Sequence, residues 1–411
     1  MNSVTFASRR ADTGRFAIVA CLLVLSFALR PGIVSIGPAL PQIQHAFGLS
    51  YSESSLLTSI PDVCMGLFVL CVPAISRRLG VDRTILFSLL LLTVATFCRA
   101  LSHSTPSLLF WTTMVGMGIA IAGGLMGGWI KKHFADESSL FMGLYAGGLS
   151  IGATVAAGGT GLIANVTGSW RIGIGTWCIL GVTAVLSWLS LSRRLSADAG
   201  NTSHQVTRTA STANTARAAI KLPWTHGRAW LIAIFFGLCQ FIAYACLAWI
   251  APWNFEVHAS RIPSGLMLGT FTLLLAAGSF AAGALARKTP DRRILLAIGT
   301  GMTAIGFAGL VFAPTSFPVV FVALIAFGQG ICFALGMTLP LDFADTPEDA
   351  HAWTMLVLFV GYLIAALGPF VFGYLRDHTG AFSYSFVTLL IVSVVTLAMT
   401  PVLKRKHGAE V

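Results

Sequence analysis

Apolar residues in this chain occur in long unbroken runs, each about as long as a membrane-spanning helix. A helix that crosses the hydrocarbon core of a bilayer needs about 20 consecutive apolar residues. Runs of this length, separated by polar or charged residues, occupy approximately 16–40, 53–76, 83–102, 106–130, 139–165, 170–191, 228–252, 263–286, 293–313, 317–341, 351–373 and 381–403. The pattern predicts an all-α membrane protein with twelve transmembrane helices.

The composition agrees with this pattern and excludes an ordinary soluble domain. Hydrophobic residues make up 56% of the 411 residues and charged residues only 10%, whereas soluble proteins carry about 25% charged residues. The first apolar run has the position of a signal peptide. It is too long for one, lacks a convincing cleavage site and contains Arg30, so we interpret it as a retained helix.

Short strings recur at a constant spacing, which indicates two related halves. Residues 82–86 (DRTIL) recur as 291–295 (DRRIL), and residues 134–136 recur as 343–345, both with a shift of 209. A polar stretch over 192–227, rich in Ser, Thr, Ala and Asn, is typical of a linker. Two parallel six-helix repeats joined in this way are the architecture of the major facilitator superfamily, with the substrate site between the halves near the membrane midplane.

The predicted domain organisation therefore has three parts. Residues 1–191 form an N-terminal six-helix bundle, residues 192–227 a cytoplasmic linker, and residues 228–411 a C-terminal six-helix bundle. The two bundles are pseudo-symmetric, as in the major facilitator fold.

Basic residues are distributed asymmetrically between the loops. The net charge is +11, and 21 of the 26 Lys and Arg fall in the two tails, the linker and the alternate loops on one side. The others are Arg99, Arg171, Arg261 and Arg376, assigned to loops on the opposite side, and Arg30 within a span. The positive-inside rule then predicts that both termini are cytoplasmic. Because the basic charge follows topology, we expect no nucleic-acid partner.

Other chemistries find little support in the sequence. The eight cysteines fall in predicted helices without paired CxxC spacing, so we interpret them as packing residues rather than metal or disulfide sites. No Gly-rich loop with Lys-Ser or Lys-Thr is present, so ATP-driven pumping is not supported, and we expect no cofactor. A membrane enzyme would need clustered His, Cys or carboxylates at one depth; we therefore expect no enzymatic activity.

Arg30 and Asp62 are the charged residues that lie well inside apolar spans. A guanidinium at the centre of a membrane helix costs at least ~2.5–3.5 kcal/mol, so Arg30 is expected to face a polar cavity and meet an anion. A structural ion pair is the alternative. The helix rise places Arg30 and Asp62 at the same depth, about 22 Å from the cytoplasmic edge. Asp62 then either compensates the charge of Arg30 or carries a proton.

The repeat assigns Arg30 a counterpart in the second half. A shift of 214 maps Arg30 onto Tyr244, and the first and seventh helices both line the central cavity in this architecture. Tyr244 combines a ring with one donor, which suits a small planar solute. Packing is the alternative role for each aromatic candidate. The further predicted substrate-binding residues are Gln240, Trp249, Gln329, Phe333 and Tyr362.

Two loops and one pair of helices have candidate conformational roles. Charged residues in the loop between the second and third helices, and in its repeat, are predicted to gate the two halves, although a plain solvated loop is the alternative. They are Arg77, Arg78, Asp82, Arg83, Asp291 and Arg292. Small-xxx-small spacing, as in Gly143-xxx-Gly147 and Gly148-xxx-Gly152, predicts close helix approach, either for sliding or for static packing.

Two strings carry a more specific family resemblance. Residues 29–41 contain Leu-Arg-Pro followed by Ser-Ile-Gly-Pro-Ala-Leu-Pro, and residues 361–369 read GYLIAALGP ahead of Asp-His-Thr-Gly at 377–380. The chain therefore resembles the cyanate permease and nitroimidazole transporter (CynX/NimT) branch of the superfamily. The resemblance implies transport of a small planar solute across the inner membrane.

The predicted function is secondary active transport of a small planar, cyanate-like anion by alternating access. Coupling to protons is predicted, with Asp62, His133 and His351 as possible carriers. The alternative within transport is export of nitroimidazole-like or other small polar heterocycles, with Arg30 holding the nitro group. A sensor that binds without flux is the alternative outside transport. The expected partners are the small-molecule substrate, protons and the bilayer, and the expected state is a monomer.

Overall fold

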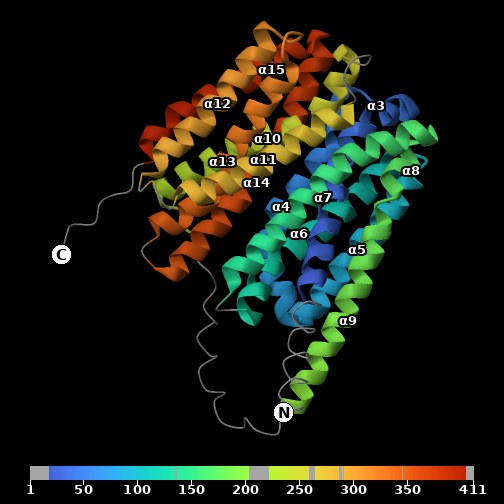
Figure 1. Ribbon diagram of the computed structural model, residues 1–411, viewed down its shortest axis with the longest axis vertical. Helices are drawn as coiled ribbons and strands as arrows, with labels where there is room; N and C mark the ends of the chain where they lie inside the picture. The colour runs from blue at the N-terminus through green and yellow to red at the C-terminus, as the bar shows by residue number, and fades with distance from the viewer. Residues whose placement is uncertain are drawn as a thin grey trace, which may run out of the picture.

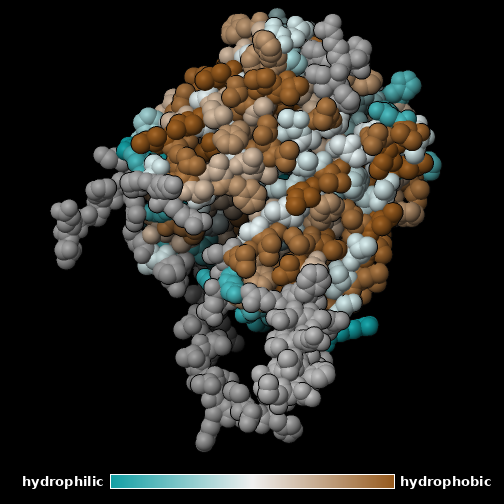
Figure 2. All heavy atoms as spheres, in the orientation of Figure 1, coloured by the Kyte–Doolittle hydropathy of each residue, from teal (hydrophilic) through white to brown (hydrophobic). Residues whose placement is uncertain are grey.

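The computed structural model describes residues 18–134, 137–202, 222–258, 264–286, 289, 291–344 and 346–403. Within these ranges the regular structure is helical, and twelve helices are long and apolar enough to cross a membrane. The twelve predicted spans are therefore confirmed. Apolar side chains cover much of the molecular face seen in Figure 2, as expected for a surface that meets lipid.

The first half contains six spans (Figure 1). The first runs from Ile18 to Phe47 and consists of a helix over 18–29, α2 (Pro31–Val34) and α3 (Ile36–Phe47). The others are α4 (Tyr51–Leu79), α5 (Val81–Ala100), α6 (Thr105–His133), α7 (Ser138–Thr167), and α8 (Trp170–Gly175) with α9 (Cys178–Thr202).

The second half contains the remaining six. They are α10 (Gly227–His258), α11 (Ser264–Ala286), α12 (Arg292–Phe312), α13 (Pro318–Phe343), α14 (Pro347–Thr379) and α15 (Phe382–Met399), followed by the short 3-10 helix η1 (Thr400–Val402). Of the predicted linker, residues 203–221 lie outside the described residues, and α9 extends into its first part. The exact domain boundaries stay a prediction.

The two halves lie side by side as separate bundles, coloured blue to green and yellow to red in Figure 1. They contact each other through α4 against α14, α7 against α11, and α3 against α10. Because the number of spans in each half is even, Ile18 and Leu403 lie at the same end of the molecule, here called the terminal end. The opposite end, which carries the loops at 48–50 and 380–381, is called the far end.

The first span is interrupted at Arg30, and the local sequence explains the interruption. Pro31 has no backbone N–H to donate to residue 27, so the helical hydrogen-bond pattern is interrupted here, although Arg30 keeps right-handed helical angles (φ −79°, ψ −36°). The helix over 18–29 ends there, α2 lasts for one turn, and a second irregularity follows at Ser35. Arg30 therefore stands at a break in a membrane helix, the kind of element on which transporters of this architecture build binding sites.

Glycines allow the first span to approach α7 closely. A Cβ at Gly152 would lie 2.5 Å from the carbonyl oxygen of Phe27, and one at Gly148 would collide with the Ser26 side chain. The close approach predicted for Gly148-xxx-Gly152 is therefore observed. At Gly143 and Gly147 a Cβ would meet nothing within 4 Å, so that pair makes no such contact.

Candidate substrate site

A cavity of about 60 Å³ lies between the two halves, beside the break in the first span. It has room for several water-sized groups, since one such group needs about 10–15 Å³. Its walls come from the first span and α7 in one half and from α10, α11 and α13 in the other. They comprise Arg30, Val34, Leu149, Ser150, Ala153, Gln240, Ala243, Tyr244, Leu247, Thr272, Leu275 and Phe333.

Four of the predicted substrate-binding residues meet at this cavity: Arg30, Gln240, Tyr244 and Phe333. Arg30 is the charged residue of the lining, and no carboxylate belongs to it. The other polar groups are neutral side chains, and the rest of the wall is apolar. Such a site combines one permanent positive charge with a small, weakly polar space.

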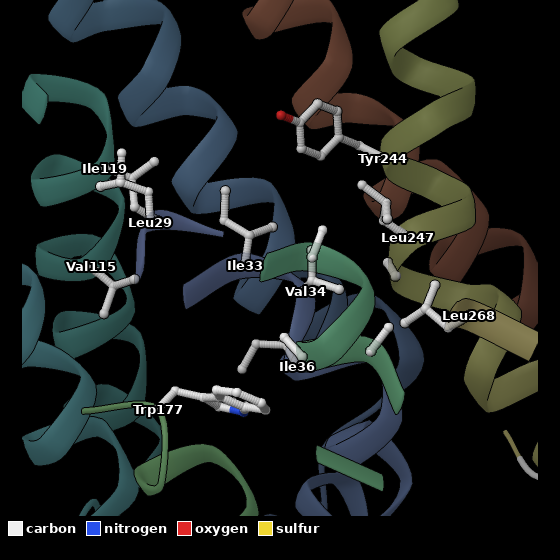
Figure 3. Close-up of a cluster of buried hydrophobic side chains, with 14 of the residues drawn as sticks. Leu29, Ile33, Val34, Ile36, Val115, Ile119, Trp177, Tyr244, Leu247 and Leu268 are labelled. Carbon is white, nitrogen blue, oxygen red and sulfur yellow. The ribbon is translucent and has the colours of Figure 1, made fainter. Parts of the chain in front are cut away.

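Tyr244 and two further tyrosines surround the Arg30 guanidinium. Tyr145, Tyr244 and Tyr362 interact with Arg30 electrostatically, and the Tyr244 hydroxyl donates to Met65 Sδ at 3.9 Å. The Tyr244 and Tyr362 rings pack edge to face, with centroids 6.2 Å apart. In Figure 3 the Tyr244 ring extends from α10 and directs its oxygen toward the side of the first half. Tyr145 was not among the predicted site residues, because its distance from Arg30 depends on how α7 packs.

Asp62 is fully buried in α4, and neither of its carboxylate oxygens has a hydrogen-bond partner in the described part of the chain. It interacts with Arg30 electrostatically. The described ion pairs join other residues, so Asp62 and Arg30 are neighbours without a direct salt bridge. Asp62 is also absent from the cavity lining.

Three predicted binding residues lie outside the lining. Trp249 is fully buried; its Nε1 donates to the Pro369 carbonyl at 2.9 Å, and its ring stacks on Phe372. Gln329 donates from Nε2 to Thr303 Oγ1 at 3.3 Å. Tyr362 does not line the cavity, but its ring packs against Tyr244 and its hydroxyl interacts electrostatically with Arg30. For Trp249 the geometry matches the packing alternative.

Sequence comparison gives this architecture a family. The profile of the Major Facilitator Superfamily matches residues 16–369. This chain belongs to the major facilitator superfamily. The cyanate transport protein CynX of Escherichia coli (strain K12) is 31% identical over 385 residues, which cover 93% of this chain and 96% of that protein. The 2-nitroimidazole transporter of the same organism is 26% identical over 399 residues, 96% of each chain. The predicted family resemblance is confirmed.

Solved structures agree with the fold. The nucleoside transporter NupG (D323A mutant) superposes with a TM-score of 0.74 at 12% identity, covering 94% of this chain and 100% of that one. The D-xylose-proton symporter gives 0.72 at 14% identity, covering 94% and 97%. Family and fold are those of transporters and not of an enzyme. The protein is therefore a membrane transporter for small molecules.

At the terminal end of this transporter, the predicted gating charges make contacts within their own halves. Asp82 accepts a hydrogen bond from Trp129 Nε1 at 2.8 Å through its carboxylate, and from Trp188 Nε1 at 3.1 Å through its carbonyl. Arg77 donates to the Pro73 carbonyl. Arg78, like Arg83, is exposed.

The repeated loop in the second half behaves in the same way. Arg292 forms an ion pair with Asp342 at 2.7 Å and donates to Thr338 Oγ1 at 2.9 Å. Asp291 pairs with Arg293. None of these contacts crosses between the halves, so in this conformation the charges stabilise each bundle separately. Their gating role stays a prediction.

The far end, in contrast, is closed by polar contacts between the halves. The Asp377 carboxylate accepts hydrogen bonds from the backbone N–H groups of Tyr51 and Ser52, at 2.9 and 2.7 Å, and from the Ser52 hydroxyl. Glu256 accepts from the Tyr51 hydroxyl across the halves at 2.6 Å and, within the second half, from Arg376 at 3.0 Å. We call these five residues the far-end clasp. Sequence reasoning missed the clasp, because its partners are far apart along the chain.

Proposed function

We propose that this transporter moves a small planar monoanion of the cyanate type across the membrane by alternating access. The observation that carries the proposal is the position of Arg30, which contributes the charge of the cavity lining at a helix break. A guanidinium stays charged and presents a planar fork of donors that suits a planar anion. A bound anion would offset the cost of holding this charge away from bulk water.

The other lining residues favour a small and weakly hydrated solute. Gln240, Tyr244 and Ser150 supply donors around Arg30, whereas Val34, Leu149 and Leu275 supply apolar walls. A strongly hydrated polyanion would lose more hydration free energy on entering this cavity than its few polar groups can replace.

We further propose that the anion moves together with a proton. An inside-negative potential opposes uptake of an anion by ~2.3 kcal/mol per charge per 100 mV, and a co-transported proton removes that cost. Asp62 is the carrier best supported by position, because it is enclosed beside Arg30. The other two candidate carriers lie elsewhere. The His133 ring hydrogen-bonds the Trp129 carbonyl and stacks on the Trp129 indole ring, and His351 is exposed on α14.

Uptake of labelled cyanate into proteoliposomes tests the anion proposal. Arg30→Gln is expected to lower the initial rate by at least about 30-fold, because charge-assisted hydrogen bonds contribute about 1.5–3 kcal/mol each. Arg30→Lys keeps the charge but loses the fork and should retain partial uptake. Arg171→Gln is the control, since Arg171 is an arginine of the first half that lies outside the cavity lining and donates to the Ser102 carbonyl. Absence of uptake by the wild type would remove cyanate as a substrate.

The coupling is tested on the wild type with an imposed pH gradient. Faster uptake into vesicles that are alkaline inside would support proton symport. Equal initial rates with and without the gradient would exclude it.

A small polar heterocycle is the second candidate substrate. It is favoured by the aromatic residues near Arg30, namely Tyr145, Tyr244, Phe333 and Tyr362, and by the similarity to the 2-nitroimidazole transporter. Rings of this kind stack on planar solutes. Arg30→Gln should abolish anion transport but only weaken binding of a neutral heterocycle, so the same variant separates the two candidates.

The remaining proposals concern cellular context. We propose a bacterial inner-membrane location with both termini in the cytoplasm, which the loop distribution of Lys and Arg supports. We also propose that one chain forms the complete transport unit, because the cavity is lined by both halves of the same chain.

A further inference from the structure

Arg99 is a second buried cation of the first half, and the substrate cavity does not include it. Arg99 lies in the last turn of α5, inside the predicted span 83–102, and 0% of its surface is exposed. Its Nη1 donates to the carbonyl oxygen of Gly32 at 2.9 Å, while Nε and Nη2 have no hydrogen-bond partner in the described part of the chain. No described carboxylate pairs with it.

The acceptor of this hydrogen bond lies in the interrupted segment of the first span. Gly32 follows Arg30 by two residues and belongs to α2, which is one turn long. The carbonyls of so short a helix lack the donors that a continuous helix would supply. Arg99 supplies one of these donors from a neighbouring helix.

Other arginines of the molecule compensate their charge differently. Arg376 pairs with Glu256, and Arg292 pairs with Asp342, both at partly exposed positions. Arg171 donates to the Ser102 carbonyl but lies over the Trp170 ring with part of its surface exposed. Arg99 has neither a carboxylate nor water-exposed surface, and its contact is to the segment that presents Arg30. Burial of an unpaired guanidinium is costly, so a purely packing side chain would fill this space better.

We propose that Arg99 is a positioning residue for Arg30. By holding the Gly32 carbonyl, it fixes the path of the broken segment and thereby the direction in which the Arg30 guanidinium enters the cavity. A guanidinium displaced by about 1 Å loses much of its binding geometry, as for other preorganised groups. This inference rests on the proposed role of Arg30 in substrate binding.

Transport kinetics provide the first test. Arg99→Met is expected to raise the KM for cyanate about tenfold with little change in the maximal rate. Arg99→Lys keeps a long side chain with a charged donor, so its KM should rise by no more than half as much. Arg171→Met is the matched control, because it removes an arginine-to-carbonyl hydrogen bond of the same half that does not involve the segment from Arg30 to Ser35. It should leave KM within twofold of wild type.

The second test does not depend on a substrate. In an Arg30→Cys background, the rate at which a small thiol reagent modifies residue 30 is followed by peptide mass spectrometry, so the native cysteines do not interfere. Adding Arg99→Met should change this rate at least fivefold, whereas adding Arg171→Met should not.

The two measurements separate the possible failures. If the wild type transports no cyanate, the proposed substrate is wrong, and the modification rates alone decide the role of Arg99. If Arg99→Met and Arg171→Met change those rates equally, or Arg99→Met changes neither rate nor KM, the positioning role is overturned. Should Arg99→Met fail to fold, the same comparisons are made with Arg99→Gln, which removes the guanidinium but stays polar; changes of the same sign are expected, and wild-type values would overturn the proposal.

Discussion

At the scale of single residues, the charge of Arg30 can be balanced either by the Asp62 carboxylate or by a bound anion. Asp62 is enclosed by protein, and its oxygens lack hydrogen-bond partners in the described residues. A carboxylate in such a place is stabilised by a nearby positive charge or by a bound proton. An anion that binds Arg30 would compete with Asp62 for that charge. This competition is the physical basis on which we expect anion and proton binding to be linked.

The Asp62→Asn variant tests this link. Asparagine keeps the shape of the side chain but cannot release a proton or carry charge. We expect cyanate uptake by this variant to lose its response to an imposed pH gradient, while exchange of labelled for unlabelled substrate at equal pH continues. Glu53→Gln, an exposed carboxylate of the same helix, is the control. An unchanged response of Asp62→Asn to the gradient would exclude Asp62 as the carrier.

Tyr244→Phe tests the contribution of one hydroxyl. The change removes a hydroxyl of the cavity lining that we expect to bind the anion, but keeps the ring that packs against Tyr362. A hydrogen bond of this kind contributes about 0.5–1.5 kcal/mol, so the KM for cyanate should rise roughly three- to tenfold. Tyr384→Phe, on the exposed surface of α15, should leave KM unchanged. Equal KM values for both variants would argue against a role of the Tyr244 hydroxyl in binding.

At the scale of elements, two glycine pairs with the same spacing behave differently. Both Gly143-xxx-Gly147 and Gly148-xxx-Gly152 place small residues on one face of α7. Only the second pair faces the helix over 18–29. The spacing therefore predicts that a close contact is possible, but the rotation of α7 about its axis selects the pair that makes it.

Gly152→Ala should destabilise the transporter, because the new methyl group would lie 2.5 Å from the Phe27 carbonyl. Inserting one carbon into a packed interface typically costs about 1–3 kcal/mol. A lower midpoint of thermal unfolding in detergent is expected. Gly147→Ala, whose methyl would meet nothing within 4 Å, should unfold at the wild-type temperature. Similar midpoints for the two variants would contradict this account of the interface.

At the scale of the whole molecule, the far-end clasp connects the two halves. Asp377 binds the first N–H groups of α4, where a carboxylate is also favoured by the helix dipole. In the proposed alternating-access cycle the halves separate at the far end in another state, and we expect these contacts to break in that state.

The Asp377→Asn variant is expected to shift the transporter toward states open at the far end. The amide keeps one acceptor oxygen but loses the charge that binds the α4 terminus. With Leu247→Cys in the cavity wall as reporter, an impermeant thiol reagent added from the far-end side should react several-fold faster. Tyr384→Phe serves again as the control. No gain in reactivity would show that the clasp does not limit opening.

Much of the architecture could be predicted from the sequence because it depends on local properties. The length of each apolar run determines whether a helix can cross the bilayer, and the twelve spans follow from it. Pro31 is a local contribution to the break at Arg30, but Pro41, Pro61 and Pro73 lie inside unbroken helices, so a proline alone does not decide where a span is interrupted. The cost of a charge in lipid pointed to Arg30 before its surroundings were known.

The tertiary structure alone decided which side chains meet. It placed Gln240, Tyr244 and Phe333 around the cavity of Arg30, left Trp249 in a packed interface, and buried Arg99 against Gly32. Helix length and hydrophobicity determine the depth of a residue but not its direction around the helix axis. That direction, and contacts between residues more than 300 positions apart such as Ser52 and Asp377, depend on how all twelve spans pack together.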